Sequence, residues 1–396
     1  SMNTVEGSGS KAVFASGISY CYAKETLKNV PDVKLVRIAT PHPFPEQFVK
    51  NVLDGVTEVM CLEELSPYIE NQILRLAGKY HMDIDVRGKQ TGDVPASGEL
   101  STNKAADILC DFLDLEKTSQ VDVSDAPELP VRPPVLCAGC PHRASFYAVK
   151  KAMAGRKSYF CGDIGCYTLG NAMPLDMVDT CLCMGAGITM AQGFSVIEPQ
   201  KKALAFVGDS TFFASGLPGI VNAVYNGHDF TLCVLDNATT AMTGSQPHPG
   251  TGVTLMGERR KPVSIEAVLK AVGFECIVHA DPLNLQQSID AAREAIDFEG
   301  PSAIMFESPC VQLFKPAAPV VLDAQRCTGC KKCITEIGCP GIGFDIDARG
   351  PKSGERGQAF IDAGQCNGCG LCTQVCPFDC ISVVDAASAA SEKKEA

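Results

Sequence analysis

The 396-residue sequence lacks three features, and each absence argues against a class of protein. No uninterrupted apolar run approaches the ~20 residues that a membrane-spanning helix needs, so we do not expect a membrane protein. No basic stretch leads into a short apolar run, so we expect no secretory signal. Lysine and arginine nowhere form a run, and the formal net charge is −12, which argues against nucleic-acid binding.

Cysteine, by contrast, is abundant, with 21 residues. In a secreted chain this number would indicate disulfides, but many of these cysteines stand at the spacing of metal ligands. We therefore expect a reducing, oxygen-poor cytoplasm. The 45% hydrophobic content fits ordinary α/β material rather than a disordered chain.

The pattern of apolar residues predicts several domains. We expect an α/β domain at 10–115, a linker at 116–133, a second α/β domain at 134–319, a cysteine-rich module at 320–385 and a disordered tail at 386–396. In both α/β domains, β-like runs alternate with helical patterns, which indicates parallel, doubly wound sheets. The cysteine-rich module has too little apolar pattern for a core, so metal must stabilise it.

The clearest elements are short. Strands are predicted at Lys11–Ser16, Val33–Ala39, Thr57–Leu62, Lys202–Val207, Phe230–Leu235 and Pro301–Glu307. Helices are predicted at Ile18–Asn29, Pro45–Leu53, Leu65–Lys79, Asn103–Leu113, Met184–Phe194 and Gly216–Tyr225.

Two cysteine runs near the C-terminus have the spacing of bacterial ferredoxins. In those proteins a C-x-x-C-x-x-C loop supplies three thiolates to one [4Fe–4S] cube, and a fourth cysteine before a proline binds the other cube. This spacing predicts two clusters, one on Cys327, Cys330, Cys333 and Cys376 and the other on Cys339, Cys366, Cys369 and Cys372. Five residues rather than three separate Cys333 from Cys339, which we interpret as a loop insertion. Zinc sites or disulfides are the alternatives, and they fit two interlocking runs poorly.

A second motif predicts a thiamine diphosphate (ThDP) site. Gly208-Asp209-Ser210 ends one apolar strand, and Asp236-Asn237 ends the next, 27 positions after Asp209. Asp209, Asn237 and the carbonyl of Thr239 are the predicted Mg²⁺ ligands at the strand ends, where the metal would hold the diphosphate. Two ordinary strand-end turns are the alternative, since Asp and Asn are common there. Further candidates to contact the cofactor are glycines before helices and hydroxyls after the second strand: Gly165, Gly185, Gly187, Thr240 and Thr243.

At this point the sequence resembles a known family, the alpha (large) subunit of indolepyruvate:ferredoxin oxidoreductase, within the 2-oxoacid:ferredoxin oxidoreductases. The similarity lies in the order of Cys137-Ala-Gly-Cys140-Pro-His-Arg143, the GDIGC run to Cys166, the GDS…DNATTAMTGSQ block and the ferredoxin motifs. Residues 10–115 resemble the family's transketolase-C-like α/β domain. The implied fold is α/β: that domain, a doubly wound ThDP-binding domain and a two-cluster, ferredoxin-like α+β module.

The resemblance also implies a third, proximal [4Fe–4S] cluster. Related enzymes hold it on a C-x-x-C, a downstream cysteine and a distant fourth one, which correspond to Cys137, Cys140, Cys166 and Cys310. An inert thiol at a strand end is the alternative for Cys310, and Cys161 would then be the next candidate. His142 is a candidate catalytic residue, although a buried structural histidine is an equal alternative.

The implied reaction is ThDP-dependent oxidative decarboxylation of an aryl 2-oxoacid with coenzyme A. The products are arylacetyl-CoA, CO₂ and reduced ferredoxin, with electrons passing from ThDP to the proximal cluster and then to the ferredoxin-type clusters. Implied partners are a beta subunit, ferredoxin and a pyrimidine-binding domain, which is not recognisable before residue 10, in a dimer of heterodimers. Two other interpretations are an electron-transfer subunit with a vestigial ThDP domain and a non-redox ThDP lyase with structural clusters.

Overall fold

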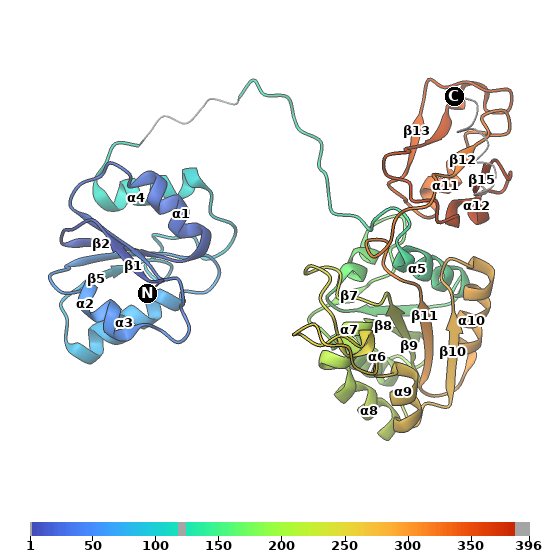
Figure 1. Ribbon diagram of the computed structural model, residues 1–396, viewed down its shortest axis with the longest axis horizontal. Coiled ribbons are helices and arrows are strands. Elements are labelled where there is room, and N and C mark those ends of the chain that lie inside the picture. Colours follow the sequence, from blue (N-terminus) through green and yellow to red (C-terminus); the bar gives the residue numbers. More distant parts are fainter. Residues whose placement is uncertain (1, 118–123, 385–396) are drawn as a thin grey trace. The chain divides into compact units, whose positions relative to one another are not determined.

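The computed structural model describes residues 2–117 and 124–384, in two compact units that divide between Pro130 and Val131 (Figure 1). The predicted tail at 386–396 lies outside the described residues. Within the described ranges, no helix has both the length and the apolar character needed to cross a membrane.

The first unit is built on a five-stranded sheet in the order β1-β3-β2-β4-β5, in which only β1 is antiparallel to its neighbour. The strands are β1 (Thr4–Glu6), β2 (Lys11–Ala15), β3 (Val33–Arg37), β4 (Glu58–Leu62) and β5 (Asp85–Arg87). The helices are α1 (Gly17–Thr26), α2 (Glu46–Val52), α3 (Tyr68–Tyr80) and α4 (Thr102–Leu113).

Helices cover both faces of this sheet. Successive side chains of a strand point to opposite faces, so Ala12 and Phe14 pack in the core that holds α2 and α3. Val13 and Ala15 pack in the core that holds α1 and α4. A strand buried on both faces has a continuous apolar sequence, which is why β2 reads as Lys-Ala-Val-Phe-Ala.

The second unit contains a fully parallel six-stranded sheet in the order β10-β11-β9-β8-β6-β7. Its strands are β6 (Ser158–Gly162), β7 (Thr180–Cys181), β8 (Lys202–Gly208), β9 (Thr231–Asp236), β10 (Cys276–Ala280) and β11 (Ser302–Glu307). The main helices are α5 (Pro141–Ala152), α6 (Ala186–Ile197), α8 (Leu217–Tyr225), α9 (Ile265–Val272) and α10 (Leu285–Asp297). Shorter turns are η1 (Cys166–Asn171), α7 (Asp209–Thr211), the π-helical η2 (Phe212–Gly216) and η3 (Pro249–Thr251).

This sheet is doubly wound, as predicted. Leu204 and Phe206 of β8 pack on the face covered by α5 and α10. Ala205 and Val207 pack on the face covered by α6, α8 and α9. Gly208 is paired with Leu235 and Asp236 with Glu307, so β8, β9 and β11 end at one edge of the sheet. The carboxyl edge of such a sheet is where ligands bind in doubly wound proteins.

The cysteine-rich module follows β11 and has little regular structure. Two antiparallel pairs form its sheets, β12 (Val321–Leu322) with β15 (Ile381–Ser382) and β13 (Ile342–Asp345) with β14 (Gln358–Ile361). Its helical turns are α11 (Lys332–Thr335), η4 (Gly354–Arg356) and α12 (Leu371–Val375). Its apolar residues belong to the same buried cluster as those of α5 and α10, and Tyr147 of α5 and Leu285 of α10 are hydrogen-bonded to it, so the module packs against these two helices.

All twelve elements predicted from the sequence are present, with ends that differ by a few residues. Several elements of the second unit were not predicted, among them β6, β10, α5, α9 and α10. In helix α5, ten of the twelve residues are buried, and the polar His142, Arg143 and Ser145 are among them.

Candidate cofactor and metal sites

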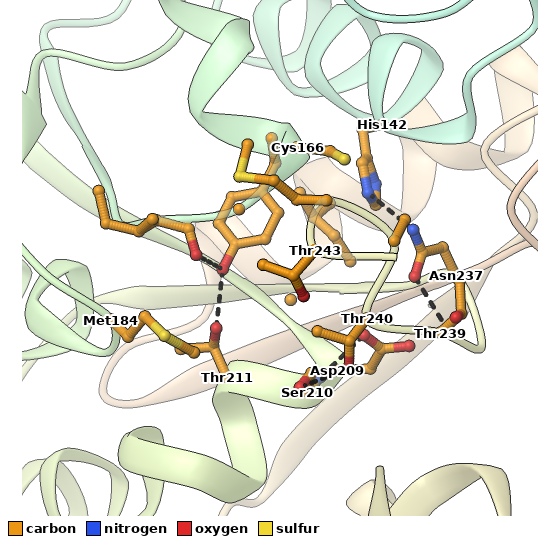
Figure 2. Close-up of a pocket in the computed structure, with 17 residues that line it drawn as sticks. His142, Cys166, Met184, Asp209, Ser210, Thr211, Asn237, Thr239, Thr240 and Thr243 are labelled. Atoms are coloured by element: carbon orange, nitrogen blue, oxygen red, sulfur yellow. Dashed lines mark hydrogen bonds between the residues drawn. The ribbon is translucent and has the colours of Figure 1, made fainter. Parts of the chain in front are cut away.

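A cavity with about 520 Å³ of empty space opens at the carboxyl ends of β8 and β9 (Figure 2). Nine residues proposed from the sequence as catalytic or cofactor-binding line it: His142, Gly165, Gly208, Asp209, Ser210, Asn237, Thr239, Thr240 and Thr243. Cys166, which the resemblance implies as a cluster ligand, is also in its lining. Residues from four separate segments therefore meet at the sheet edge.

Asp209 lies at the base of this cavity and is buried. Its Oδ1 accepts a hydrogen bond from the backbone N–H of Ser210 at 2.7 Å. Its Oδ2 is 3.0 Å from Nε2 of His248 but makes no hydrogen bond of acceptable geometry. A buried carboxylate oxygen without a hydrogen bond fits a cation ligand, since an unpaired charge is costly to bury.

A second carboxylate stands beside Asp209. Burial raises the pKa of Asp236, and the neighbouring charge of Asp209 raises it further. Two carboxylates side by side in a buried site repel one another, and a divalent cation would compensate them. From the sequence, Asp236 was identified only as the residue before Asn237, although its acidic side chain at a strand end was a signal for this site.

Asn237 links the cavity to His142. Its Oδ1 accepts from the N–H of Thr239 at 3.3 Å, and its side-chain amide is 3.2 Å from Nε2 of His142 (Figure 2). Burial lowers the pKa of His142 to about 4, so the imidazole is neutral at physiological pH. A neutral ring that accepts at Nε2 carries its proton on Nδ1.

Hydroxyl groups form the other side of the cavity. Thr240 Oγ1 donates to Ser210 Oγ at 2.9 Å, which joins the turn after β9 to the turn after β8. Thr243 Oγ1 donates to Oε1 of Gln246 at 2.6 Å. These hydroxyls can reorient toward the oxygens of a diphosphate.

The glycines have packing roles. A Cβ on Gly208 would lie 2.6 Å from the ring of Tyr167, and one on Gly165 only 2.4 Å from it, so the tyrosine requires glycine at both positions. Gly185 and Gly187 do not line the cavity. Gly185 has a φ of +86° where α6 begins, and Gly187 allows α6 to approach the backbone of β6.

Asp163 was not proposed from the sequence. Its side chain is fully buried, and its Oδ2 accepts from the N–H of Gly185 at 2.8 Å, while Oδ1 has no hydrogen-bond partner. Burial raises its pKa to about 6. The only sequence signal was its place in the GDIG turn.

Four cysteines from three segments gather next to the cavity. Besides burial, the thiolates of Cys310 and Cys137 raise the pKa of Cys166, and the Cys137 thiolate also raises that of Cys140. Burial, and then the charges of Cys137 and Asp209, raise the pKa of Cys310. Positive iron bound to the four thiols would reverse this mutual repulsion, so the group fits a cluster.

The backbone of Cys310 is hydrogen-bonded to a residue that lines the cavity. Ser308 N–H donates to the carbonyl of Asp236 at 3.0 Å, and Cys310 N–H, two residues further on, donates to the carbonyl of Asn237 at 2.9 Å. The pairing of β11 with β9 thus continues past the end of both strands. This pairing brings Cys310 to the edge that holds Asp209.

The ferredoxin-type cysteines form two separate groups. Cys327, Cys330, Cys333 and Cys376 line one cavity; Cys339, Cys366, Cys369 and Cys372 line another. After burial, the other three thiolates of each group raise the pKa of Cys333 and Cys372, to about 11 and about 12 respectively. In the described residues no three His, Cys, Asp or Glu side chains converge on one metal ion, as a zinc site requires. A cube distributes its ligands over four irons, so these wider groups fit it better.

Cys380 is a fifth thiol at the first of these cavities. Its Sγ lies 3.2 Å from that of Cys376, and both residues are buried. Cys380 was not proposed as a ligand from the sequence. The signal that could have identified it is its position four residues after Cys376, just before β15.

Two known protein families match parts of the second unit. Residues 163–306 match the family described as "Thiamine pyrophosphate enzyme, C-terminal TPP binding domain". Residues 319–380 match the family described as "4Fe-4S dicluster domain". The chain therefore has a ThDP-binding domain followed by an iron–sulfur domain.

Curated relatives extend the match to nearly the whole chain. The protein named "Indolepyruvate oxidoreductase subunit IorA" of Thermococcus kodakarensis is 38% identical over 95% of this chain and 61% of its own length. Those of Methanothermobacter thermautotrophicus and Pyrococcus abyssi are 36% and 37% identical, each over 96% of this chain and over 61% and 62% of their own lengths. The chain is thus similar to IorA proteins over nearly its whole length. It spans about three-fifths of the length of these curated IorA relatives.

Among solved structures, the chain is similar to a 2-oxoglutarate:ferredoxin oxidoreductase from Magnetococcus marinus. The TM-score is 0.40 and the identity 21%, over 46% of this chain and 66% of that chain.

Proposed function

We propose that this chain takes part in the oxidative decarboxylation of an aryl 2-oxoacid, such as indolepyruvate, with coenzyme A. The products are arylacetyl-CoA, CO₂ and reduced ferredoxin. One observation carries the proposal: Cys310 N–H is bonded to the carbonyl of Asn237, so the thiol group and the ThDP cavity share one edge of the sheet. A ThDP lyase without redox chemistry has no need of thiols there.

In the cofactor site, Asp209, Asn237 and the Thr239 carbonyl are proposed to hold Mg²⁺. Ser210, Thr240 and Thr243 would donate hydroxyl hydrogen bonds to the diphosphate. ThDP, when bound, supplies the carbanion chemistry that cleaves a 2-oxoacid beside its keto carbon. His142 faces the same cavity as a neutral imidazole and is suited to hydrogen-bond the substrate or to move a proton.

Three [4Fe–4S] clusters are proposed as the electron carriers. The proximal one would be held by Cys137, Cys140, Cys166 and Cys310. The two others would use the ferredoxin-type groups, with Cys327, Cys330, Cys333 and Cys376 in one and Cys339, Cys366, Cys369 and Cys372 in the other. Soluble ferredoxin is the proposed final acceptor and a beta subunit the proposed partner, in the cytoplasm.

The test uses the enzyme purified anaerobically with the subunits that accompany this chain. Indolepyruvate, coenzyme A, ThDP and Mg²⁺ are added, and the visible absorbance of the clusters is followed. We expect bleaching that needs all four additions and is slower with pyruvate. Bleaching by dithionite but never by a 2-oxoacid would refute the proposal and favour a pure electron-transfer role. Zinc in place of iron would refute any redox role.

A further inference from the structure

Arg143 is a buried cation without a carboxylate partner in the described part of the chain. It is only 3% exposed and follows the C-x-x-C loop at the start of α5. Its Nη1 donates to the carbonyls of Ile337 and Gly338 at 2.6 and 2.8 Å, and Nη2 donates to the carbonyl of Leu136. Its Nε is buried and has no hydrogen-bond partner. Carbonyl dipoles alone are a weak compensation for a full buried charge.

Thiolates supply the negative charge near Arg143. Burial lowers the pKa of the guanidinium, and four cysteines oppose this effect: Cys339, Cys140, Cys137 and Cys369. Two of them belong to the proximal group and two to a ferredoxin-type group. The guanidinium therefore lies within electrostatic reach of both.

Packing shows that these two groups are neighbours. The cavity of the Cys339 group is lined by Ala138, Gly139 and Arg143 as well as by its own four cysteines. Gly139 has a φ of +72°, and a Cβ there would lie 2.0 Å from Oδ1 of Asn367. The C-x-x-C loop of the proximal group is thus in direct contact with the loop after Cys366. The cavity of the Cys327 group, by contrast, is lined only by residues from 322 to 381.

We propose that Arg143 is a positive charge shared by the proximal cluster site and the Cys339 cluster site. This inference rests on the proposed function. A fixed cation would stabilise the more negative, reduced form of a cluster, so Arg143 would raise the reduction potential of a cluster held at either site. Arg143 stays protonated, because a guanidinium is always charged in proteins.

The test separates the charge of Arg143 from its hydrogen bonds. Arg143→Gln removes the charge, whereas Arg143→Lys keeps it and loses the planar fork. Arg326→Gln is the matched control: Arg326 is about half exposed, precedes Cys327 and also donates to a backbone carbonyl, that of Phe378 at 2.9 Å. Iron content and redox titrations followed by electron paramagnetic resonance are measured on the purified enzyme without substrate. Cys366→Ser and Cys330→Ser assign the signals to the two ferredoxin-type clusters.

For Arg143→Gln we expect two of the three potentials, those of the proximal and Cys339 clusters, to move to more negative values. The Cys327 cluster should keep its potential. Arg143→Lys should shift the same two potentials by a smaller amount. Arg326→Gln should leave all three potentials unchanged, because solvent screens the charge of Arg326. If Arg143→Gln loses iron, the test is made with Arg143→Lys. That variant must keep its iron and must leave the three cluster potentials in the same order as in the parent enzyme.

Three results would overturn the inference. They are unchanged potentials in Arg143→Gln, equal shifts or equal iron loss in the Gln and Lys variants, and an equal shift at the Cys327 cluster. Equal effects of Gln and Lys would mean that Arg143 only fastens loop 136–143 to loop 337–338. A parent enzyme without iron–sulfur signals would instead refute the proposed function, so the two failures are distinguishable.

Discussion

Asp163 provides a direct test of the electrostatics beneath the cofactor cavity. Its carboxylate is fully buried, accepts one hydrogen bond from Gly185 N–H and has a second oxygen without a partner. Asp163→Asn keeps the shape and the acceptor while it removes the charge. We therefore expect the variant to be more stable than the parent at neutral pH.

The expected gain in the free energy of unfolding follows from the pKa of Asp163, which burial raises from 3.8 to about 6. The ionised form in the folded state therefore costs up to about 3 kcal/mol, since each tenfold change in proton affinity corresponds to about 1.4 kcal/mol. An unpaired amide N–H in the variant offsets roughly 1 kcal/mol of the gain. About 2 kcal/mol remains, which raises the unfolding temperature by several degrees.

The stability difference between the parent and Asp163→Asn should depend on pH, and the raised pKa fixes its direction. Because the folded-state pKa of this carboxyl lies above the unfolded value, the destabilisation is complete above about pH 6 and is relieved as the pH falls toward 3.8. Thermal unfolding of parent and variant should thus differ at pH ~8 and converge near pH ~4. Asp163→Ala is the control: it also removes the charge but leaves Gly185 N–H without an acceptor, so it should be less stable than Asp163→Asn at every pH. A variant that gains nothing at pH ~8, or gains equally at pH ~4, would refute this reasoning.

The remaining predictions concern metal and cofactor. Asp209→Ala should weaken the binding of ThDP with Mg²⁺ sharply in calorimetry and leave iron unchanged; equal affinity would count against the Mg²⁺ assignment. Cys310→Ser should lower iron by up to ~4 of ~12 per chain, or leave a three-iron cluster, with the ferredoxin-type resonances intact. Full iron and an unchanged spectrum would place the fourth ligand elsewhere. Cys376→Ser should keep its cluster through Cys380, whereas the Cys376→Ser, Cys380→Ser double variant should lose it. Loss of iron in the single variant would show that Cys380 does not ligate.

Local spacing determined what a loop or two neighbouring strands can bring together. Cys366, Cys369 and Cys372 are close in any fold, because a C-x-x-C-x-x-C loop is too short to separate them. Asp209 and Asn237 meet because each ends a parallel strand, and the carboxyl ends of adjacent strands share one edge. The apolar runs of β8 and β9 predicted those strands for the same reason, since a strand buried on both faces is apolar throughout.

Amphipathic periodicity was informative only where one face of a helix meets water. Helix α10 has an apolar stripe and the side chain of Asn284 as its N-cap, so its sequence carried a signal that the prediction did not use. Helix α5 is a different case, because ten of its twelve residues are buried, polar ones included. Its polar residues His142 and Arg143 are therefore buried by tertiary packing that no local pattern reveals.

Only the tertiary structure decided which distant groups become neighbours. The position of Cys310 beside Asn237 depends on β11 pairing with β9 rather than with another strand. The contact between Gly139 and Asn367 depends on how the cysteine-rich module packs against α5. Sequence separation contains no information about such contacts, since strand order and module packing are set by the sum of many burial terms. The sequence alone thus determined the chemistry of the ligands, and the fold determined which of them face one another.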